Sequence, residues 1–336
     1  MTSERDAWLA LTVEEVLEPE LAICDPHHHL WDRPDSRYLL DELLADTRGG
    51  GHNITETVFV ECSAMYRKDG PAAMASVGEV EFVQGVAAQS ASGNYGDARL
   101  AAGIIGFADL SAGSAVSEVL EAHISASRDR FRGIRHASVW DASPELTSYK
   151  KPPEGLLGDT KFREGIAALG NLGLSYEAWL YHTQLAELVD LANAFPNVPI
   201  VLDHIGGPIG IGPYEGKNDE VMSSWKAGIT AVAACPNVVV KLGGFGMPLG
   251  GFGWHERERP AGSAELAATM GPWYLHCIEA FGVDRCMFES NFPVDKQSVS
   301  YTVLWNTFKR MAEGFSADEK AALFRGTALR TYRIGG

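Results

Sequence analysis

Eight short runs rich in β-branched and other apolar residues alternate along this chain with segments of helical period. The β-rich runs are Leu21–Leu30, Thr57–Cys62, Leu100–Phe107, Phe131–Val139, Leu174–Tyr181, Val198–His204, Val238–Leu242 and Arg285–Ser290. The helical segments between them include Gly78–Ser90, Ser117–Ser127, Thr183–Ala194, Ser223–Ala234 and Pro272–Phe281. Strands that alternate with helices indicate βαβ units and a parallel sheet. Eight such units over about 250 residues predict a closed (β/α)8 TIM barrel.

An open doubly wound sheet is the alternative fold. It fits less well, because no Gly-x-Gly-x-x-Gly follows the first strand, where that fold places a dinucleotide site. Barrels of this class reach the length of this chain as one domain. We therefore expect residues 1–336 to form a single (β/α)8 domain, with residues 1–20 as an N-terminal leader.

The charge and composition exclude several classes of partner. The chain has 46% hydrophobic and 21% charged residues, as in a soluble globular enzyme, and a formal net charge of -16. This acidic balance argues against nucleic acid and against anionic membrane surfaces. The N-terminal segment has no basic region followed by an apolar core, and no run of about 18 apolar residues occurs, so neither a signal peptide nor a membrane span is expected.

The cysteines and tryptophans suggest where the protein works and how it assembles. The 5 cysteines are an odd number without a Cys-x-x-Cys pair, which indicates reduced thiols in a cytoplasmic protein. Three tryptophans, Trp254, Trp273 and Trp305, are expected to be exposed and to favour a homo-oligomer.

The sequence Asp25-Pro26-His27-His28-His29 closes the first β-rich run. Side chains two residues apart in a strand project to the same face, so His27 and His29 are expected to point together at one metal ion or one substrate. A solvated histidine run, as in a purification tag, is the alternative. The apolar strand before the run and the aromatic residue after it disfavour that alternative.

Polar residues recur where the other predicted strands end, at the face where barrels of this class carry their active sites. These residues are Glu61, Arg132, Arg135, His136, His182, Asp203, His204, Lys241, Glu289 and Asn291. Glycine-rich loops, 206–213 and 243–254, follow the sixth and seventh strands. Each loop is either a mobile lid or ordinary turn structure.

Several of these residues also have structural explanations. His136 could be a hydrogen-bond partner, His182 could cap the following helix, and Lys241 could pair with a carboxylate beneath the site. Arg135 lies among apolar residues, and a buried guanidinium needs an anion. That anion is either Glu61 or a substrate carboxylate.

Four motifs occur in an order that resembles the amidohydrolase-related family of barrel hydrolases. They are Asp25-x-His27-x-His29-Leu30-Trp31-Asp32, Arg132-Gly133-Ile134-Arg135, Val201-Leu202-Asp203-His204-Ile205-Gly206-Gly207-Pro208 and Phe288-Glu289-Ser290-Asn291-Phe292-Pro293. The family includes pyrone-dicarboxylate lactonase, sugar lactonases and related decarboxylases. The resemblance implies a (β/α)8 barrel whose site combines the His-x-His pair, histidines of the middle strands and an acidic residue after the eighth strand.

The chain departs from the family at that last element. The usual ending is Gly-Ser-Asp-x-Pro, whose aspartate binds metal or acts as general base. Here Asn291 takes that place, and an amide cannot accept a proton from water. The base must then be Glu289, Asp295 or His204.

Metal binding stays open at this point. Three neutral nitrogens with an open fourth position suit a catalytic zinc, and His27, His29 and either His182 or His204 could supply them. The resemblance to lactonases also implies that such a site can work without metal.

The sequence therefore predicts a hydrolase that adds water to the carbonyl of a small lactone carrying a carboxylate. His27 and His29 would polarise the carbonyl directly or through zinc, and His204, or a carboxylate near Asn291, would activate water. The residues expected to bind the anionic substrate are Arg135, His136, Glu61 and Tyr66. A metal-dependent non-oxidative decarboxylase and a catalytically silent ligand-binding barrel are the alternatives.

Overall fold

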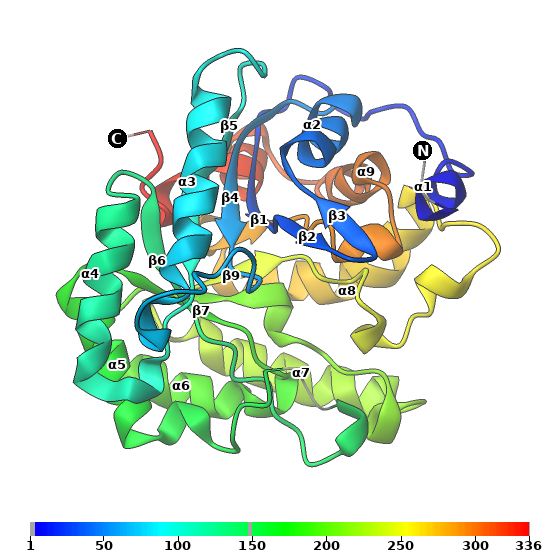
Figure 1. Cartoon of the computed structure of the whole chain (residues 1–336). Helices are drawn as coiled ribbons and strands as arrows, with labels where there is room; N and C mark the ends of the chain where they lie inside the picture. The colour runs from blue at the N-terminus through cyan, green and yellow to red at the C-terminus, as the bar shows by residue number, and fades with distance from the viewer. Residues whose placement is uncertain (1–3, 147–149, 336) are drawn as a thin grey trace.

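The computed structural model describes residues 4–146 and 150–335 of the chain. Eight parallel strands form one sheet in the order β1-β4-β5-β6-β7-β8-β9-β10. They are β1 (Ile23–His28), β4 (Ile54–Val60), β5 (Arg99–Gly106), β6 (Phe131–Arg135), β7 (Ser175–Ala178), β8 (Ile200–Leu202), β9 (Val238–Leu242) and β10 (Cys286–Phe288). Each lies within or overlaps one predicted β-rich run. The fold is a TIM barrel, as predicted (Figure 1).

The segment after β10 closes the barrel against β1. His28 and Phe292 form a parallel bridge. The backbone N–H of His29 donates to the Phe292 carbonyl at 2.8 Å, and that of Asn291 donates to the His27 carbonyl at 2.9 Å. The closing hydrogen bonds therefore join the His-x-His segment directly to the residues that follow the eighth barrel strand.

Helices cover the outside of the strands (Figure 1). The longer ones are α2 (Leu40–Gly49), α3 (Val77–Ala91), α4 (Ser117–Ala126), α5 (Thr160–Asn171), α6 (Leu185–Ala194), α7 (Asn218–Ala233), α8 (Ser263–Phe281) and α9 (Tyr301–Met311). Three short helices are α1 (Glu4–Leu9), α10 (Ala317–Ala321) and α11 (Thr327–Thr331). Helix α8 begins at Ser263 rather than at Pro272, which lies inside it.

A small antiparallel hairpin follows β1. Its strands are β2 (Trp31–Arg33) and β3 (Ser36–Tyr38), with Trp31 opposite Tyr38. The indole N–H of Trp31 donates to Ser36 Oγ at 2.9 Å. The hairpin therefore lies at the carboxyl end of the first barrel strand.

The core has two apolar layers. Strand side chains such as Val58, Ile105, Val201 and Met287 fill the barrel interior and pack against Tyr332. The outward faces of the strands pack against the helices in a larger cluster.

The prediction that three tryptophans are exposed is wrong. Trp254, Trp273 and Trp305 are buried, with relative exposures of 3%, 8% and 0%. Their large apolar rings pack within the chain itself, so they give no support to an oligomer. Among the described residues, no helix combines the length and hydropathy needed to cross a membrane. The cysteines are buried free thiols.

Residues of the expected N-terminal leader pack against the barrel. The backbone N–H of Leu17 donates to Asn306 Oδ1 at 2.9 Å, and Lys309 Nζ donates to the Leu17 carbonyl at 2.7 Å. Both partners lie on α9, so this helix anchors the segment that leads into β1.

Candidate active site

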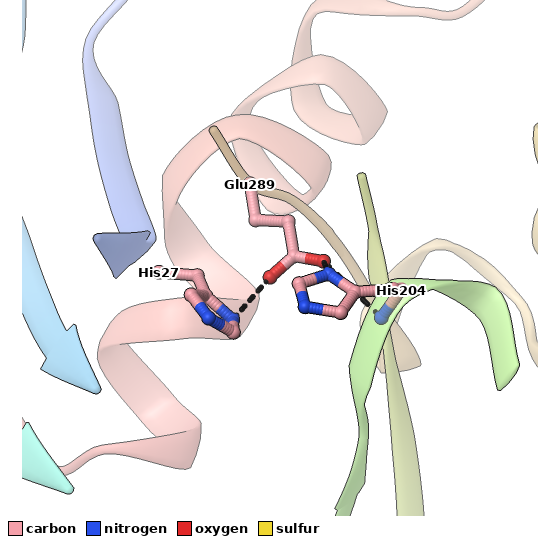
Figure 2. A group of neighbouring side chains, drawn as sticks. All are labelled: His27, His204 and Glu289. Carbon is pink, nitrogen blue, oxygen red and sulfur yellow. Dashed lines mark hydrogen bonds and ion pairs between the residues drawn. The ribbon is translucent and has the colours of Figure 1, made fainter. Parts of the chain in front are cut away.

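A single carboxylate joins two histidines at the carboxyl ends of the barrel strands. Glu289 follows β10, His27 lies in β1 and His204 follows β8. Glu289 Oε2 is 2.7 Å from His27 Nδ1, and Oε1 is 2.6 Å from His204 Nδ1. Figure 2 shows the carboxylate between the two imidazoles. If the proton of the His204 ring is on Nδ1, the Nε2 atom has a free lone pair and can accept a proton as a general base.

The local backbone brings His204 to Glu289. His204 has a φ of 52°, in the left-handed region, and its backbone N–H donates to Glu289 Oε1 at 3.2 Å. Gly243 and Gly244, which follow β9, lie against this pair. A Cβ on Gly243 would collide with the Glu289 side chain, and one on Gly244 would lie 2.7 Å from His204 Cβ. The glycines therefore permit a close approach of the loop to the site.

His27 and His29 point together, as alternation predicts. Their Nε2 atoms are 3.3 Å apart, and His29 Nδ1 is 2.8 Å from the Val60 carbonyl. A carbonyl only accepts, so His29 carries its proton on Nδ1 and presents a lone pair at Nε2. Burial lowers the pKa of both imidazoles well below the ordinary value, and the positive charges of Lys241 near His27 and of Arg135 near His29 lower it further. Both rings are therefore neutral at neutral pH.

The carboxylates that face Arg135 are Glu61 and, at 3.6 Å from its Nη1, Asp203. Arg135 Nε is 3.1 Å from Glu61 Oε1, and Nη2 donates to the Glu61 carbonyl at 2.5 Å. Its Nη1 lies 3.2 Å from His27 Nε2. The guanidinium thus links the end of β4 to the His-x-His pair.

A buried charge network lies around His27. Lys241 Nζ is 2.5 Å from Glu177 Oε2, 3.1 Å from Asp203 Oδ1 and 3.2 Å from His27 Nδ1. Tyr332 OH donates to Glu177 Oε1 at 2.8 Å. Burial acts to lower the pKa of Lys241, but the carboxylates of Asp203, Glu177 and Glu289 outweigh it and raise the pKa. Lys241 is therefore a charged ammonium below the site.

Glu177 is absent from the sequence prediction. A signal for it exists in the sequence, because it is an isolated acidic residue within the otherwise apolar β-rich run of β7. A buried charge of this kind requires a partner, which only the fold identifies as Lys241.

A cavity of about 210 Å³ opens above these residues. Its lining includes five of the predicted site residues: His29, Glu61, Arg135, His204 and Asn291. Asn291 Nδ2 donates to Asp295 Oδ1 at 2.8 Å. Its Oδ1 is buried and has no hydrogen-bond partner among the described residues. Asn291 thus lines the cavity and keeps a buried acceptor oxygen that no described residue pairs with.

Three predicted residues lie outside this group. The His182 ring contacts Tyr214 edge-on, with the ring centroids 5.3 Å apart. His182 begins the short 3-10 turn that precedes α6. His136 Nδ1 accepts a hydrogen bond from the backbone N–H of Leu110 at 3.2 Å, in keeping with its structural alternative. Tyr66 is half-buried and does not line the cavity.

The residues present fit a divalent metal by donor type. Among the described residues, one set of three possible metal ligands has its donor atoms within 4.8 Å of one another. The set comprises His27, His204 and Glu289. Imidazole nitrogen and carboxylate oxygen are ligands that zinc accepts. An ion held by these residues would take the place of the Nδ1 protons that now face the Glu289 carboxylate. Of the residues expected to hold a metal, His27 and His204 belong to this group and His29 and His182 do not, while Glu289, expected only as a base, supplies the third donor.

Comparison with known proteins identifies the family. Residues 24–334 match the amidohydrolase family (Amidohydro_2: Amidohydrolase). The uncharacterized protein y4mH of Sinorhizobium fredii is 32% identical over 94% of this chain and 99% of its own length. An L-fucono-1,5-lactonase of Burkholderia multivorans is 28% identical over 71% of this chain and 73% of its own. The crystal structure of an amidohydrolase from B. multivorans with bound Zn has a TM-score of 0.70 and 24% identity, and covers 93% of this chain and 99% of that one. The chain belongs to the amidohydrolase 2 family.

Proposed function

We propose that this protein hydrolyses a small lactone that carries a carboxylate. The observation that supports the proposal best is the position of the Glu289 carboxylate, 2.7 Å from His27 Nδ1 and 2.6 Å from His204 Nδ1, beside a cavity of about 210 Å³. A cavity of that size suits a ligand smaller than a typical drug. The similarity to an L-fucono-1,5-lactonase supports the same reaction class.

His204 is the general base of the proposed reaction. Its Nε2 takes a proton from a water molecule, and the Glu289 carboxylate at Nδ1 stabilises the imidazolium that forms. Asn291 Oδ1 accepts a hydrogen bond from the same water and orients it. This arrangement needs no acidic residue at position 291, which resolves the departure from the family pattern.

The positive charge of Arg135 assists the attack on the carbonyl. Arg135 lines the cavity and lies 3.2 Å from His27 Nε2. As water adds to the lactone carbonyl, negative charge develops on its oxygen, and a fixed cation nearby offsets that charge. His29 presents a lone pair at Nε2, so in this tautomer it accepts a hydrogen bond and does not donate one to the oxyanion.

A divalent metal such as zinc, held by His27, His204 and Glu289, would supply Lewis-acid polarisation and a bound water of lowered pKa. Without a metal, the Glu289 carboxylate orients the two imidazoles through their Nδ1 atoms; a metal held by the same three residues would take over that role.

The test is an assay of the purified protein on a panel of carboxylated and uncharged γ- and δ-lactones, with ring opening followed by a pH indicator. We expect Glu289→Gln to lower kcat by about 100-fold or more, since general-base assistance contributes about 10²–10⁴-fold. The matched control is Glu81→Gln, which removes an exposed carboxylate paired with Arg67. Both variants should unfold cooperatively.

Two outcomes would contradict the proposal. Release of carbon dioxide from an aromatic acid, with no lactone opened, would show the decarboxylase alternative instead. Binding of a ring acid with no turnover of any substrate would indicate a silent barrel.

A further inference from the structure

Two cationic side chains outside the proposed catalytic group line the same cavity. They are Arg33, on the β2–β3 hairpin, and Lys150, in the segment between β6 and α5. Neither takes part in the chemistry described above. Both stand at the cavity wall, where a substituent of a bound ring would lie.

The environment of Arg33 holds its guanidinium in place. Its central carbon lies 4.2 Å from the centre of the Trp31 ring, and Nη2 donates to the Cys62 carbonyl at 3.2 Å. Trp31 in turn stacks on His29, with centroids 5.9 Å apart and planes inclined by 23°. A guanidinium held by an indole ring and a backbone carbonyl has less freedom to lose when it binds a carboxylate. The hairpin thus connects Arg33 to the His-x-His pair through one aromatic ring.

Lys150 is also held by specific contacts. Its Nζ is 2.6 Å from Ser63 Oγ, 3.3 Å from Glu61 Oε2 and 4.8 Å from the centre of the Phe107 ring. Ser63 and Glu61 lie immediately after β4. The ammonium therefore belongs to the same wall as the Glu61–Arg135 pair.

The charge at the cavity is opposite to that of the whole chain. The cavity lining contains three cations (Arg33, Arg135, Lys150) and one carboxylate (Glu61), an excess of two positive charges. The chain as a whole carries -16. A cationic lining in an acidic protein selects an anionic ligand and raises its local concentration.

Arg135 is poorly placed to bind the carboxylate of the substrate. Its Nε and Nη2 already bond Glu61, and its Nη1 faces His27. A carboxylate bound there would compete with the contacts that position the His-x-His pair. We therefore expect other cationic side chains, rather than Arg135, to bind the anionic group of the substrate.

We propose that Arg33 and Lys150 form the subsite for the carboxylate of the substrate. The apolar body of the ring packs on the indoles of Trp31 and Trp179, which also line the cavity. The substrate class is thus a monocyclic lactone whose carboxylate is a substituent separate from the reacting carbonyl. This inference rests on the proposed function for the lactone, but the carboxylate subsite can be tested without turnover.

The test compares two ring probes that cannot be hydrolysed as lactones, tetrahydrofuran-2-carboxylate and tetrahydrofuran-2-carboxamide, by isothermal titration calorimetry. Wild-type protein should bind the acid about tenfold more tightly than the amide, because charge-assisted hydrogen bonds distinguish the two. Arg33→Gln and Lys150→Gln should each reduce that preference and leave the affinity for the amide unchanged.

The controls remove the same charge from neighbouring positions. Arg37→Gln lies on the same hairpin, where Arg37 pairs with Asp41 and Glu42, and Lys151→Gln changes an exposed lysine. Neither residue lines the cavity, so both controls should keep the wild-type preference.

Equal affinity for acid and amide, binding of neither probe, or an equal loss in the control variants would overturn the subsite. The proposed function fails separately, if the acid preference behaves as expected but no lactone is opened. Conversely, lactone hydrolysis without any preference for the acid would leave the function and exclude the subsite.

Discussion

In the proposed reaction, Glu289 and Asn291 share the role that one aspartate has in the family pattern that this chain resembles. Glu289 stands where that pattern has glycine, and its carboxylate contacts both His27 and His204. Asn291 stands where the pattern has aspartate; it lines the cavity and its Nδ2 donates a hydrogen bond to Asp295. The acidic residue of this chain thus lies two positions earlier than in the family pattern, where its carboxylate contacts both imidazoles.

Restoring the acid with Asn291→Asp should destabilise the protein and increase its metal content. The change removes the donor to Asp295 Oδ1, now at 2.8 Å, and places two carboxylates together in a buried site. We expect a loss of about 1–3 kcal/mol in the free energy of unfolding, measured by urea denaturation, and more zinc retained after purification, measured by elemental analysis. Asn94→Asp, at an exposed position, is the control. Unchanged stability and unchanged zinc would contradict this account of Asn291.

At the scale of elements, the two glycine-rich loops are positioned by close packing around the site. Gly207 has a φ of 50°, and a Cβ there would lie 2.5 Å from the Leu180 carbonyl. Gly243 and Gly244 face Glu289 and His204 in the same way. Close packing against the site therefore accounts for glycine at these positions.

Gly243→Ala should disturb Glu289 more than it disturbs the fold. The added Cβ would collide with the Glu289 side chain, so the carboxylate must leave its position between the imidazoles. We expect kcat on a lactone substrate to fall by about 100-fold, with the unfolding transition still cooperative by calorimetry.

Gly85→Ala is the matched control, because nothing lies within 4 Å of a Cβ at that position of α3. It should stabilise the helix by up to about 1 kcal/mol. Full activity in Gly243→Ala would show that the loop yields without moving Glu289.

At the scale of the whole molecule, buried neutral histidines make stability depend on pH. His123 on α4 has Nε2 2.9 Å from the Phe107 carbonyl, and its ring stacks on Phe131 with centroids 5.0 Å apart. Burial lowers the pKa of His123 to about 4, from an ordinary value of 6.5, despite the hydrogen bond to Phe107. The unfolded chain therefore binds more protons than the folded chain between these two values.

The free energy of unfolding should accordingly fall as pH decreases from 6.5 towards 4. The contribution of His123 is fully present above its unfolded pKa and is lost through that window, by at most about 3 kcal/mol. His123→Gln keeps a donor for the Phe107 carbonyl and should flatten the dependence, measured by urea titrations at successive pH values. His255→Gln, at a less buried position, serves as the control. A slope that does not change in His123→Gln would assign the effect to other groups.

The sequence by itself determined the eight barrel strands, their parallel arrangement and the set of polar residues at their carboxyl ends. These properties depend on local periodicity, which the chain carries in the apolar runs and in the alternation of His27 and His29. Periodicity also placed Glu61, Arg135, His204 and Asn291 at the strand ends, where they line the cavity.

Only the tertiary structure decided which of those polar residues contact one another. The choice of Glu61 as the partner of Arg135, and of Glu289 as the partner of both His27 and His204, depends on distances between strands far apart in the chain. Burial of the tryptophans and the β2–β3 hairpin likewise depend on packing between distant segments. Local sequence patterns predict which face of a strand a side chain occupies, whereas the curvature and closure of the barrel determine which other side chains it contacts.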